Sequence, residues 1–145
     1  MKVKDCMTRD VIVAEPETPI RDAAQMMQDA DAGILPVAKH GHLFGVVTDR
    51  DIVVRGLARG LGPDAVVDQV MSQDCACAAE DDDLDDIAER MAELQVRRMP
   101  VTREGGMLIG VISLADIARS KPNQGPRRAG QALRGIAQPG QPHNP

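Results

Sequence analysis

Aromatic residues are almost absent from this chain of 145 residues, which has one phenylalanine, Phe44, and no tryptophan or tyrosine. Its core must therefore be built from aliphatic side chains and from some of its eight methionines. Proteins that bind single-stranded nucleic acids use aromatic rings for base stacking together with a basic groove. Because the chain has 17 Lys and Arg against 22 Asp and Glu, its composition argues against a nucleic-acid partner.

Long hydrophobic runs are also missing. No stretch approaches the roughly 20 apolar residues of a membrane span, and no apolar run of signal-peptide length follows the first residues. We therefore expect a cytoplasmic protein with no membrane partner. The cysteines are Cys6, Cys75 and Cys77, an odd number for which we expect no disulfides in a reducing compartment. No second Cys or His pair lies at ligand spacing, and a zinc site needs about four ligands, so we expect no metal.

An internal duplication is what the sequence does have. A shift of 64 residues aligns Met7 with Met71 and Pro36-Val37 with Pro100-Val101. After a one-residue insertion, the alignment continues through Gly45-Val46-Val47-Thr48 with Gly110-Val111-Ile112-Ser113, and through Asp51-Ile52 with Asp116-Ile117. We therefore divide the chain into repeat 1, residues 1–62, and repeat 2, residues 63–120.

Each repeat has the same predicted order of elements. In repeat 1, a short apolar strand over residues 11–13 precedes Thr18, an expected N-cap, and Pro19, at the expected first helical position. The helix runs from about residue 20 to 30, and two strands, 34–38 and 43–48, flank a turn at residues 40–42. A second helix begins near Asp49. The repeat therefore reads β-α-β-β-α, which gives an α/β (α+β) fold class.

Repeat 2 keeps this plan with different residues. Cys75 and Cys77 take the places of Val11 and Val13, alternate positions of the expected strand, and we interpret them as small buried hydrophobic residues. The acidic run over residues 80–86 lies where the helix begins, and acidic side chains there complement the helix dipole. We favour a solvated helix start over a cation site.

The composition changes from Lys121 onward, where 13 of the last 25 residues are Pro, Gly or Gln and none is acidic. This composition predicts a disordered tail over residues 121–145. Its basic residues could bind the acidic body or an acidic partner, or could have no specific role.

Each repeat ends its last strand with a hydroxyl residue three positions before a carboxylate, Thr48 before Asp51 and Ser113 before Asp116. One interpretation is a capping box, which satisfies backbone N–H groups at a helix start. The other is a nucleotide site, in which the hydroxyl and the helix start hold a phosphate and the carboxylate accepts hydrogen bonds from ribose. Two further features favour a ligand: a glycine that would let it approach the backbone, and the basic pair Arg97-Arg98.

The duplicated plan, the Leu35-Pro36-Val37 and Met99-Pro100-Val101 strands and the two glycine-to-aspartate motifs resemble the tandem CBS domain, or Bateman module, over about residues 3–120. The chain looks most like the stand-alone bacterial proteins of that family. The resemblance implies two repeats packed as a pseudo-twofold disc, with clefts for an adenine nucleotide ligand such as AMP, ADP or ATP, or for NAD or S-adenosylmethionine.

The resemblance also implies site residues. Ribose contacts would fall on Asp51 and Asp116, and phosphate contacts on Thr48, Ser113, Arg97 and Arg98. Repeat 1 has Gly33 and Ile34 in place of the two arginines. The two clefts should therefore be unequal, and one could be empty.

We therefore predict a non-catalytic regulatory module that binds an adenosine-type nucleotide and is read by an unknown effector protein. The sequence shows no Ser/His/Asp or Cys/His arrangement typical of a catalytic site, so we expect that the protein is not an enzyme. The alternative is a CBS-pair interaction module with no nucleotide ligand, in which both hydroxyl–aspartate pairs are only caps. A DNA-binding function would rest on the basic tail alone.

For assembly we predict a homodimer. The first helix of each repeat carries more apolar surface than one thin two-layer disc can bury, and methionine-rich faces suit helix association. These side chains are Ala23, Ala24, Met26 and Met27 in repeat 1, and Ile87, Ala88, Met91 and Leu94 in repeat 2.

Overall fold

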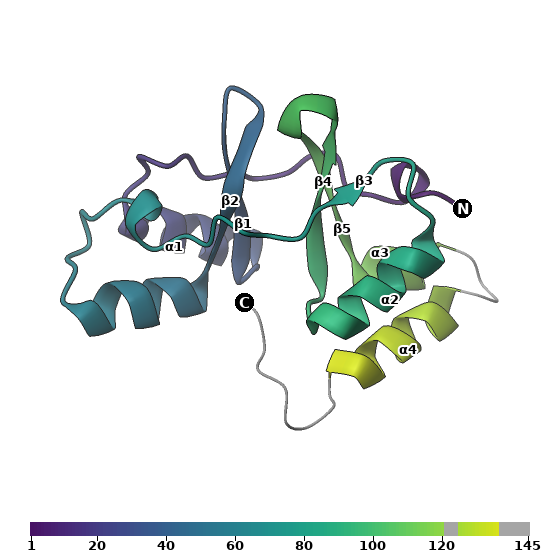
Figure 1. Ribbon diagram of the computed structural model, residues 1–145. Coiled ribbons are helices and arrows are strands. Elements are labelled where there is room, and N and C mark those ends of the chain that lie inside the picture. Colours follow the sequence, from purple (N-terminus) through teal and green to yellow (C-terminus); the bar gives the residue numbers. More distant parts are fainter. Residues whose placement is uncertain (121–124, 137–145) are drawn as a thin grey trace. The chain divides into compact units, whose positions relative to one another are not determined.

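Residues 1–120 and 125–136 are described in this computed structural model, and the chain divides into two compact units (Figure 1). The first-repeat unit contains residues 12–75 and 105–108. The second-repeat unit contains residues 1–11, residues 76–104 and the described residues from 109 onward. The N-terminal residues thus pack with repeat 2, although by sequence they begin repeat 1. Likewise, residues 63–75 begin repeat 2 by sequence and pack with repeat 1.

Residues 1–11 and 63–75, which we call the leading segments, are thus exchanged between the repeats, and they follow one hydrogen-bonding pattern in both units. In the second-repeat unit, Thr8 pairs antiparallel with Val111, and each backbone N–H donates to the other's carbonyl at 2.9 Å. In the first-repeat unit, Ser72 pairs antiparallel with Val46 through bonds of 2.8 and 3.0 Å. Thr8 and Ser72 are equivalent under the 64-residue shift. Each leading segment therefore lies beside the last strand of the other repeat.

The first-repeat unit contains α1 (Ile20–Ala30), β1 (Ile34–Lys39), β2 (His42–Thr48) and the short helical segments η2 (Asp51–Gly56), η3 (Leu57–Arg59) and η4 (Val67–Gln69). Strands β1 and β2 pair antiparallel. The turn between them has His40 at φ 53° and Gly41 at φ 79°, two left-handed residues as a two-residue hairpin requires. The predicted helix over 20–30 and the predicted hairpin are confirmed.

The second-repeat unit contains η1 (Val3–Asp5), β3 (Ala78–Ala79), α2 (Leu84–Leu94), β4 (Arg98–Arg103), most of β5 (Met107–Ser113), α3 (Leu114–Ala118) and α4 (Gly125–Ile136). The turn η5 (Glu104–Gly106) precedes β5. Strand β3 pairs parallel with β4, which neighbours β5. Asp83 caps α2 by accepting a hydrogen bond from the Asp85 N–H at 2.9 Å, so the acidic run begins the helix as predicted.

Both cores are aliphatic, as the composition predicts. In the second-repeat unit, Leu84, Ile87, Met91, Met99, Ile112 and Ile117 are almost fully buried. In the first-repeat unit, Leu35, Val37, Val47, Val67 and Val70 take that place. The single phenylalanine, Phe44, is 44% exposed and packs edge-on against His42 rather than in a core.

Three local predictions are wrong. Residues 11–13 do not form a strand, because parallel pairing with β1 is limited to a single bridge at Ala14. Cys75 and Cys77 are half-buried in an irregular segment before β3, and the residue that is buried there is Ala78. Thr18 does not cap α1. Its hydroxyl accepts a hydrogen bond from the Glu15 N–H at 3.0 Å, and Pro19 stands at the N-cap position.

The prediction of a disordered tail is wrong over residues 125–136, which form α4 beside α2 (Figure 1). Ala129, Ala132 and Ile136 are buried against the core cluster that contains Ile87 and Met91. Three glycines, three arginines and a proline make up more than half of α4, but its few apolar residues recur at helical spacing and lie on one face. Residues 121–124 and 137–145 of the predicted tail lie outside the described residues.

Candidate functional site

The first hydroxyl–carboxylate pair lies where β2 ends and the helix leading into η2 begins. The Thr48 N–H donates to Asp51 Oδ2 at 3.0 Å, and the Asp51 N–H donates to Thr48 Oγ1 at 3.0 Å. We call this pair the first box. Thr48 and Asp51 are only 3% and 2% exposed. The guanidinium of Arg55 lies beside the other carboxylate oxygen, with Nε 3.7 Å from Asp51 Oδ1.

The second pair repeats this geometry between β5 and α3, and we call it the second box. The Ser113 N–H donates to Asp116 Oδ2 at 3.0 Å, and the Asp116 N–H donates to Ser113 Oγ at 3.1 Å. Asp116 is 6% exposed. Its Oδ1 accepts a hydrogen bond from Arg119 Nη2 at 2.9 Å and one from the Thr8 hydroxyl at 3.4 Å. Both boxes are therefore capping boxes, and in both a second carboxylate oxygen faces an arginine.

The backbone at the two boxes offers little to a phosphate. Besides the N–H groups of the two aspartates, the Leu114 N–H donates to the Arg97 carbonyl and the Asp49 N–H to the Gly33 carbonyl, each at 2.9 Å. These are two of the N–H groups at each box by which the expected helix start would hold an anion, and at the first box the Arg50 N–H is bonded as well, to Asp49 Oδ1. Because they are already bonded, a phosphate here would depend on side chains. A hydroxyl that accepts one hydrogen bond still has its own proton to donate.

The two motif glycines have a role different from the one expected. A Cβ on Gly110 would lie 2.6 Å from the Thr8 carbonyl oxygen, and one on Gly45 would collide with the Ser72 carbonyl oxygen. The chain's own leading segments therefore occupy the space that we assigned to a ligand. Glycine is required at both positions because backbone approaches backbone there.

Arg97 and Arg98 lie beside the second box. Arg98 begins β4, and the hydrogen bond from the Leu114 N–H to the Arg97 carbonyl brings the chain before β4 next to Ser113. Both arginines are exposed. The structure thus brings together Ser113, Asp116 and the start of the basic pair within the second-repeat unit. In the first-repeat unit, Gly33 stands in the equivalent place, bonded to Asp49.

Three residues at the boxes were missed from the sequence: Thr8, Arg55 and Arg119. The two arginines could have been found, because each follows its aspartate by about one helical turn, where oppositely charged side chains meet. Thr8 gave no signal, since it lies 108 positions from Asp116 along the chain.

The described residues contain no group of three or more His, Cys, Asp or Glu side chains arranged to hold a metal ion. None of the described helices is long and apolar enough to cross a membrane. The decisive comparison is with protein families, where the CBS domain matches residues 3–57 and 67–123. The chain belongs to the CBS domain family. The two matches confirm the two tandem repeats that the duplication predicts.

A CBS relative of similar length is the CBS domain-containing protein YhcV of Bacillus subtilis. It is 35% identical over 135 residues, which are 93% of this chain and 94% of that protein. Stand-alone CBS proteins of this kind are generally regulatory modules rather than enzymes.

Solved CBS structures share the fold. Hypoxic Response Protein I, solved with two coordinated zinc ions, is 35% identical with a TM-score of 0.76, over 84% of this chain and all of that one. CBSX2 in complex with AMP is 27% identical with a TM-score of 0.73, over 81% of this chain and 93% of that one. The CBS domain pair of MJ0100, in complex with 5′-methylthioadenosine and S-adenosyl-L-methionine, is 27% identical with a TM-score of 0.71, over 82% and 94%.

Proposed function

We propose that this CBS protein is a non-catalytic regulatory module that binds an adenosine-type ligand at its two boxes. In this proposal, Asp51 and Asp116 accept hydrogen bonds from ribose hydroxyls, and the Thr48 and Ser113 hydroxyls donate to a ligand oxygen. Arg97 and Arg98 add positive charge beside Ser113. An effector protein then distinguishes the liganded from the unliganded state, which requires that the ligand bind one conformation more tightly than the other.

The observation that carries the proposal is that the two carboxylate oxygens of each aspartate make different contacts. Capping uses only Oδ2, yet each carboxylate is more than nine-tenths buried, and its Oδ1 faces an exposed arginine side chain. Burying a carboxylate is costly unless its oxygens are bonded, and a cap needs only one of them. The second oxygen, present in both repeats, suits a ribose hydroxyl pair. Relatives solved with AMP and with S-adenosyl-L-methionine support the same class of ligand.

A ribose that binds Asp116 Oδ1 must replace Arg119, and the longer hydrogen bond from the Thr8 hydroxyl with it. The Arg119 side chain is 72% exposed and its Asp116 partner only 6%, so a displaced guanidinium returns to water while the buried carboxylate oxygen needs a new donor. A charged acceptor hydrogen-bonded to ligand is worth about 1.5–3 kcal/mol. Ribose hydroxyls would supply that donor in place of Arg119.

One observation supports the competing function, an interaction module with no nucleotide. Both boxes are closed by reciprocal hydrogen bonds of 3.0 to 3.1 Å, so capping alone accounts for that part of the pattern. The two functions separate in a binding experiment.

Calorimetric titration of ligand-free protein with AMP, ADP, ATP, NAD and S-adenosylmethionine tests the proposal. Asp116→Ala should weaken the binding of at least one of them about 10- to 150-fold, through the lost ribose contact. The same substitution removes half of a capping box and should lower the free energy of unfolding by about 0.5–2 kcal/mol.

Asp83→Ala is the matched control, because Asp83 caps α2 in the same unit through one backbone N–H and has no place in the proposed site. It should lower stability similarly and leave binding unchanged. Ligand at about 100 times its dissociation constant should stabilise the wild-type protein by about 2.7 kcal/mol. Absence of heat and of thermal stabilisation with all five compounds would leave the interaction module as the function.

A further inference from the structure

We propose that the two boxes bind different classes of adenosine ligand: the second box a phosphorylated one, and the first box one without phosphate, either neutral or cationic. This inference rests on the proposed function and adds the ligand class of each site. It is carried by three pairs of equivalent residues beside the boxes, whose summed charge is negative in the first-repeat unit and positive in the second-repeat unit.

The equivalence of these positions is fixed by a shared backbone contact. The residue after each box hydroxyl donates its N–H at 2.9 Å, from Asp49 to the Gly33 carbonyl and from Leu114 to the Arg97 carbonyl. Gly33 is thus the counterpart of Arg97, and Ile34 that of Arg98. Asp49 is the counterpart of the buried Leu114.

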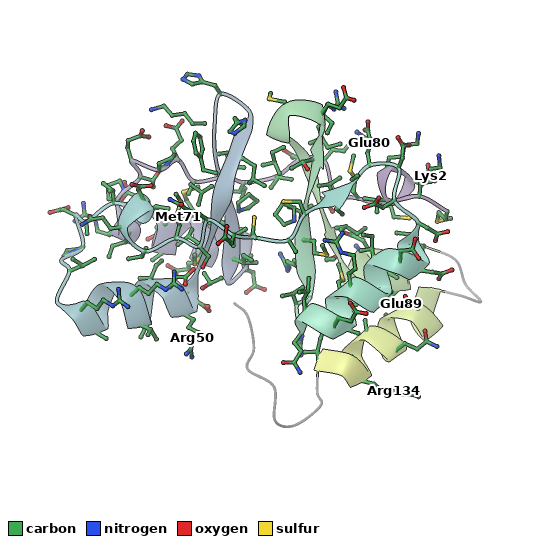
Figure 2. The ribbon with its side chains drawn as sticks, in the orientation of Figure 1. Lys2, Arg50, Met71, Glu80, Glu89 and Arg134 are labelled. Atoms are coloured by element: carbon green, nitrogen blue, oxygen red, sulfur yellow. The ribbon has the colours of Figure 1, made fainter. Side chains whose placement is uncertain are left out.

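In the first-repeat unit, the Asp49 carboxylate occupies the space in which the side chain of Arg97 begins in the second-repeat unit. A Cβ built on Gly33 would lie 2.9 Å from Asp49 Oδ2. The Asp49 side chain therefore covers the backbone position from which the Arg97 side chain departs in the second-repeat unit. Its other oxygen, Oδ1, accepts a hydrogen bond from the Arg50 N–H at 2.8 Å, which orients the carboxylate. Arg50 itself is exposed, and its side chain points away from the strands (Figure 2).

The remaining charges at the boxes balance each other. Arg55 lies beside Asp51 and also donates to the Met71 carbonyl at 3.4 Å, while Arg119 pairs with Asp116. Each unit therefore has one aspartate and one arginine at the ribose position. The three flanking positions differ: they carry a charge of −1 in the first-repeat unit and +2 in the second.

A phosphate monoester carries about −1.5 to −2 charges at pH 7. It is attracted to Arg97 and Arg98 beside Ser113, and repelled by Asp49 beside Thr48. Rejecting a ligand through a like charge is a common means of specificity. A nucleoside, or a sulfonium compound such as S-adenosylmethionine, carries no phosphate and meets no such repulsion at the first box.

Adenosine and AMP, which differ only in the phosphate, test the inference by calorimetry on single-site variants of the full chain. Asp116→Ala leaves the first box, which should bind adenosine at least about tenfold more tightly than AMP. Asp51→Ala leaves the second box, which should bind AMP at least about tenfold more tightly than adenosine. If either variant fails to fold, Asp116→Asn and Asp51→Asn retain an oxygen for the cap and replace the charged ribose acceptor.

The charge itself is tested by Asp49→Asn in the Asp116→Ala background. It should lower the adenosine-to-AMP preference about three- to tenfold in 50 mM salt and less in 500 mM salt, because salt screens exposed charges. Asp29→Asn, which removes the same charge from α1, should have no such effect. The inference would be overturned if the two boxes had the same adenosine-to-AMP preference, or if Asp49→Asn did not change that preference. Binding of adenosine in either case would still support the proposed function. No binding of adenosine, AMP or S-adenosylmethionine to the wild-type protein would overturn both.

Discussion

Gly110 has two neighbours that explain it without any ligand, the Thr8 carbonyl oxygen and the Met7 sulfur. We predict that Gly110→Ala lowers the free energy of unfolding by about 1–3 kcal/mol, because a Cβ there forces the leading segment off the strand. Gly62→Ala is the control, since nothing lies within 4 Å of its Cβ position. It should be neutral or stabilise slightly. Urea unfolding measures both, and equal stabilities of the two variants would contradict the close approach.

Arg119 occupies the carboxylate oxygen that we assign to ribose. We therefore predict that Arg119→Gln tightens adenosine binding to the second box about two- to fivefold, since the guanidinium no longer competes with ribose for Asp116 Oδ1. Titration in the Asp51→Ala background measures this box alone. Arg103→Gln, which removes the same charge from a 3.7 Å pair with Glu80, should leave adenosine affinity unchanged. Weaker adenosine binding by Arg119→Gln would instead show that Arg119 holds the ligand.

For single residues, the sequence predicts contacts between side chains within one helical turn of each other, but it does not predict contacts between residues that are far apart along the chain. The pairs Thr48 with Asp51 and Ser113 with Asp116 were found because their spacing is local. The hydrogen bond from Thr8 to Asp116 depends on an exchange of segments that no local pattern records. For the same reason the glycines were assigned to a ligand rather than to the leading segments.

Among the elements, α4 changes an expectation about the tail. A disordered tail would be dispensable, but α4 covers Ile87, Ala88 and Met91 of α2 with Ala129, Ala132 and Ile136. We predict that truncation after residue 120 lowers the melting temperature by several degrees, because burial of Ile136 alone contributes about 1.5–3 kcal/mol. Truncation after residue 136 keeps α4 and is the control. Equal melting temperatures of the two truncated chains would show that α4 contributes no stability.

The Lys4–Asp81 ion pair, 3.0 Å long, ties the N-terminal residues to the segment before α2. Figure 2 shows the neighbouring Lys2 and Glu80 at the same edge of the unit. A hydrogen bond from Lys4 is the main cause that lowers the pKa of Asp81 below 3.8, and the same contact raises the pKa of Lys4. The contribution of Asp81 is therefore present above its unfolded pKa and is lost as the pH falls through the lowered folded pKa.

We accordingly predict that Lys4→Gln raises the pKa of Asp81 toward 3.8, followed by NMR titration of its carboxyl carbon. The pKa of Glu17, which is lowered by Lys39 in the other unit, should stay where it is and serves as the internal control. An unchanged Asp81 titration would mean that the pair does not form in solution.

Elements with strong periodicity were predicted well, and those that depend on partners were not. α1 and the β1–β2 hairpin follow from apolar spacing and from the turn at His40–Gly41. The first predicted strand of each repeat is shorter in the structure. In repeat 1 only Ala14 pairs with β1, and in repeat 2 only Ala78–Ala79 pair with β4. α4 was missed because glycine and proline outweigh its three buried apolar residues in any compositional count.

For the whole molecule, the homodimer stays a prediction, and the structure narrows its basis. Ile87, Ala88 and Met91 are buried inside their own unit, so α2 does not offer them to a partner. Exposed apolar side chains remain in the first-repeat unit, with Val53 53% and Leu57 71% exposed. If a second copy covers them, Leu57→Asp should convert the dimer to a monomer, while Leu133→Asp on α4 should not. Light scattering at micromolar concentration measures this, and a monomeric wild-type protein would end the prediction.

The exchange of leading segments also determines the order in which parts of the chain can fold during synthesis. Residues 1–11 leave the ribosome before the strands of either repeat, yet the strand beside which Thr8 lies includes Val111, which is made about 100 residues later. At synthesis rates of about 5–20 residues per second, this segment waits about 5–20 s for its partner. Most of the first-repeat unit, residues 12–75, is made early in that interval and can assemble while the leading segment waits. The segment that leads repeat 1 is therefore paired only when the last strand of repeat 2 has been made.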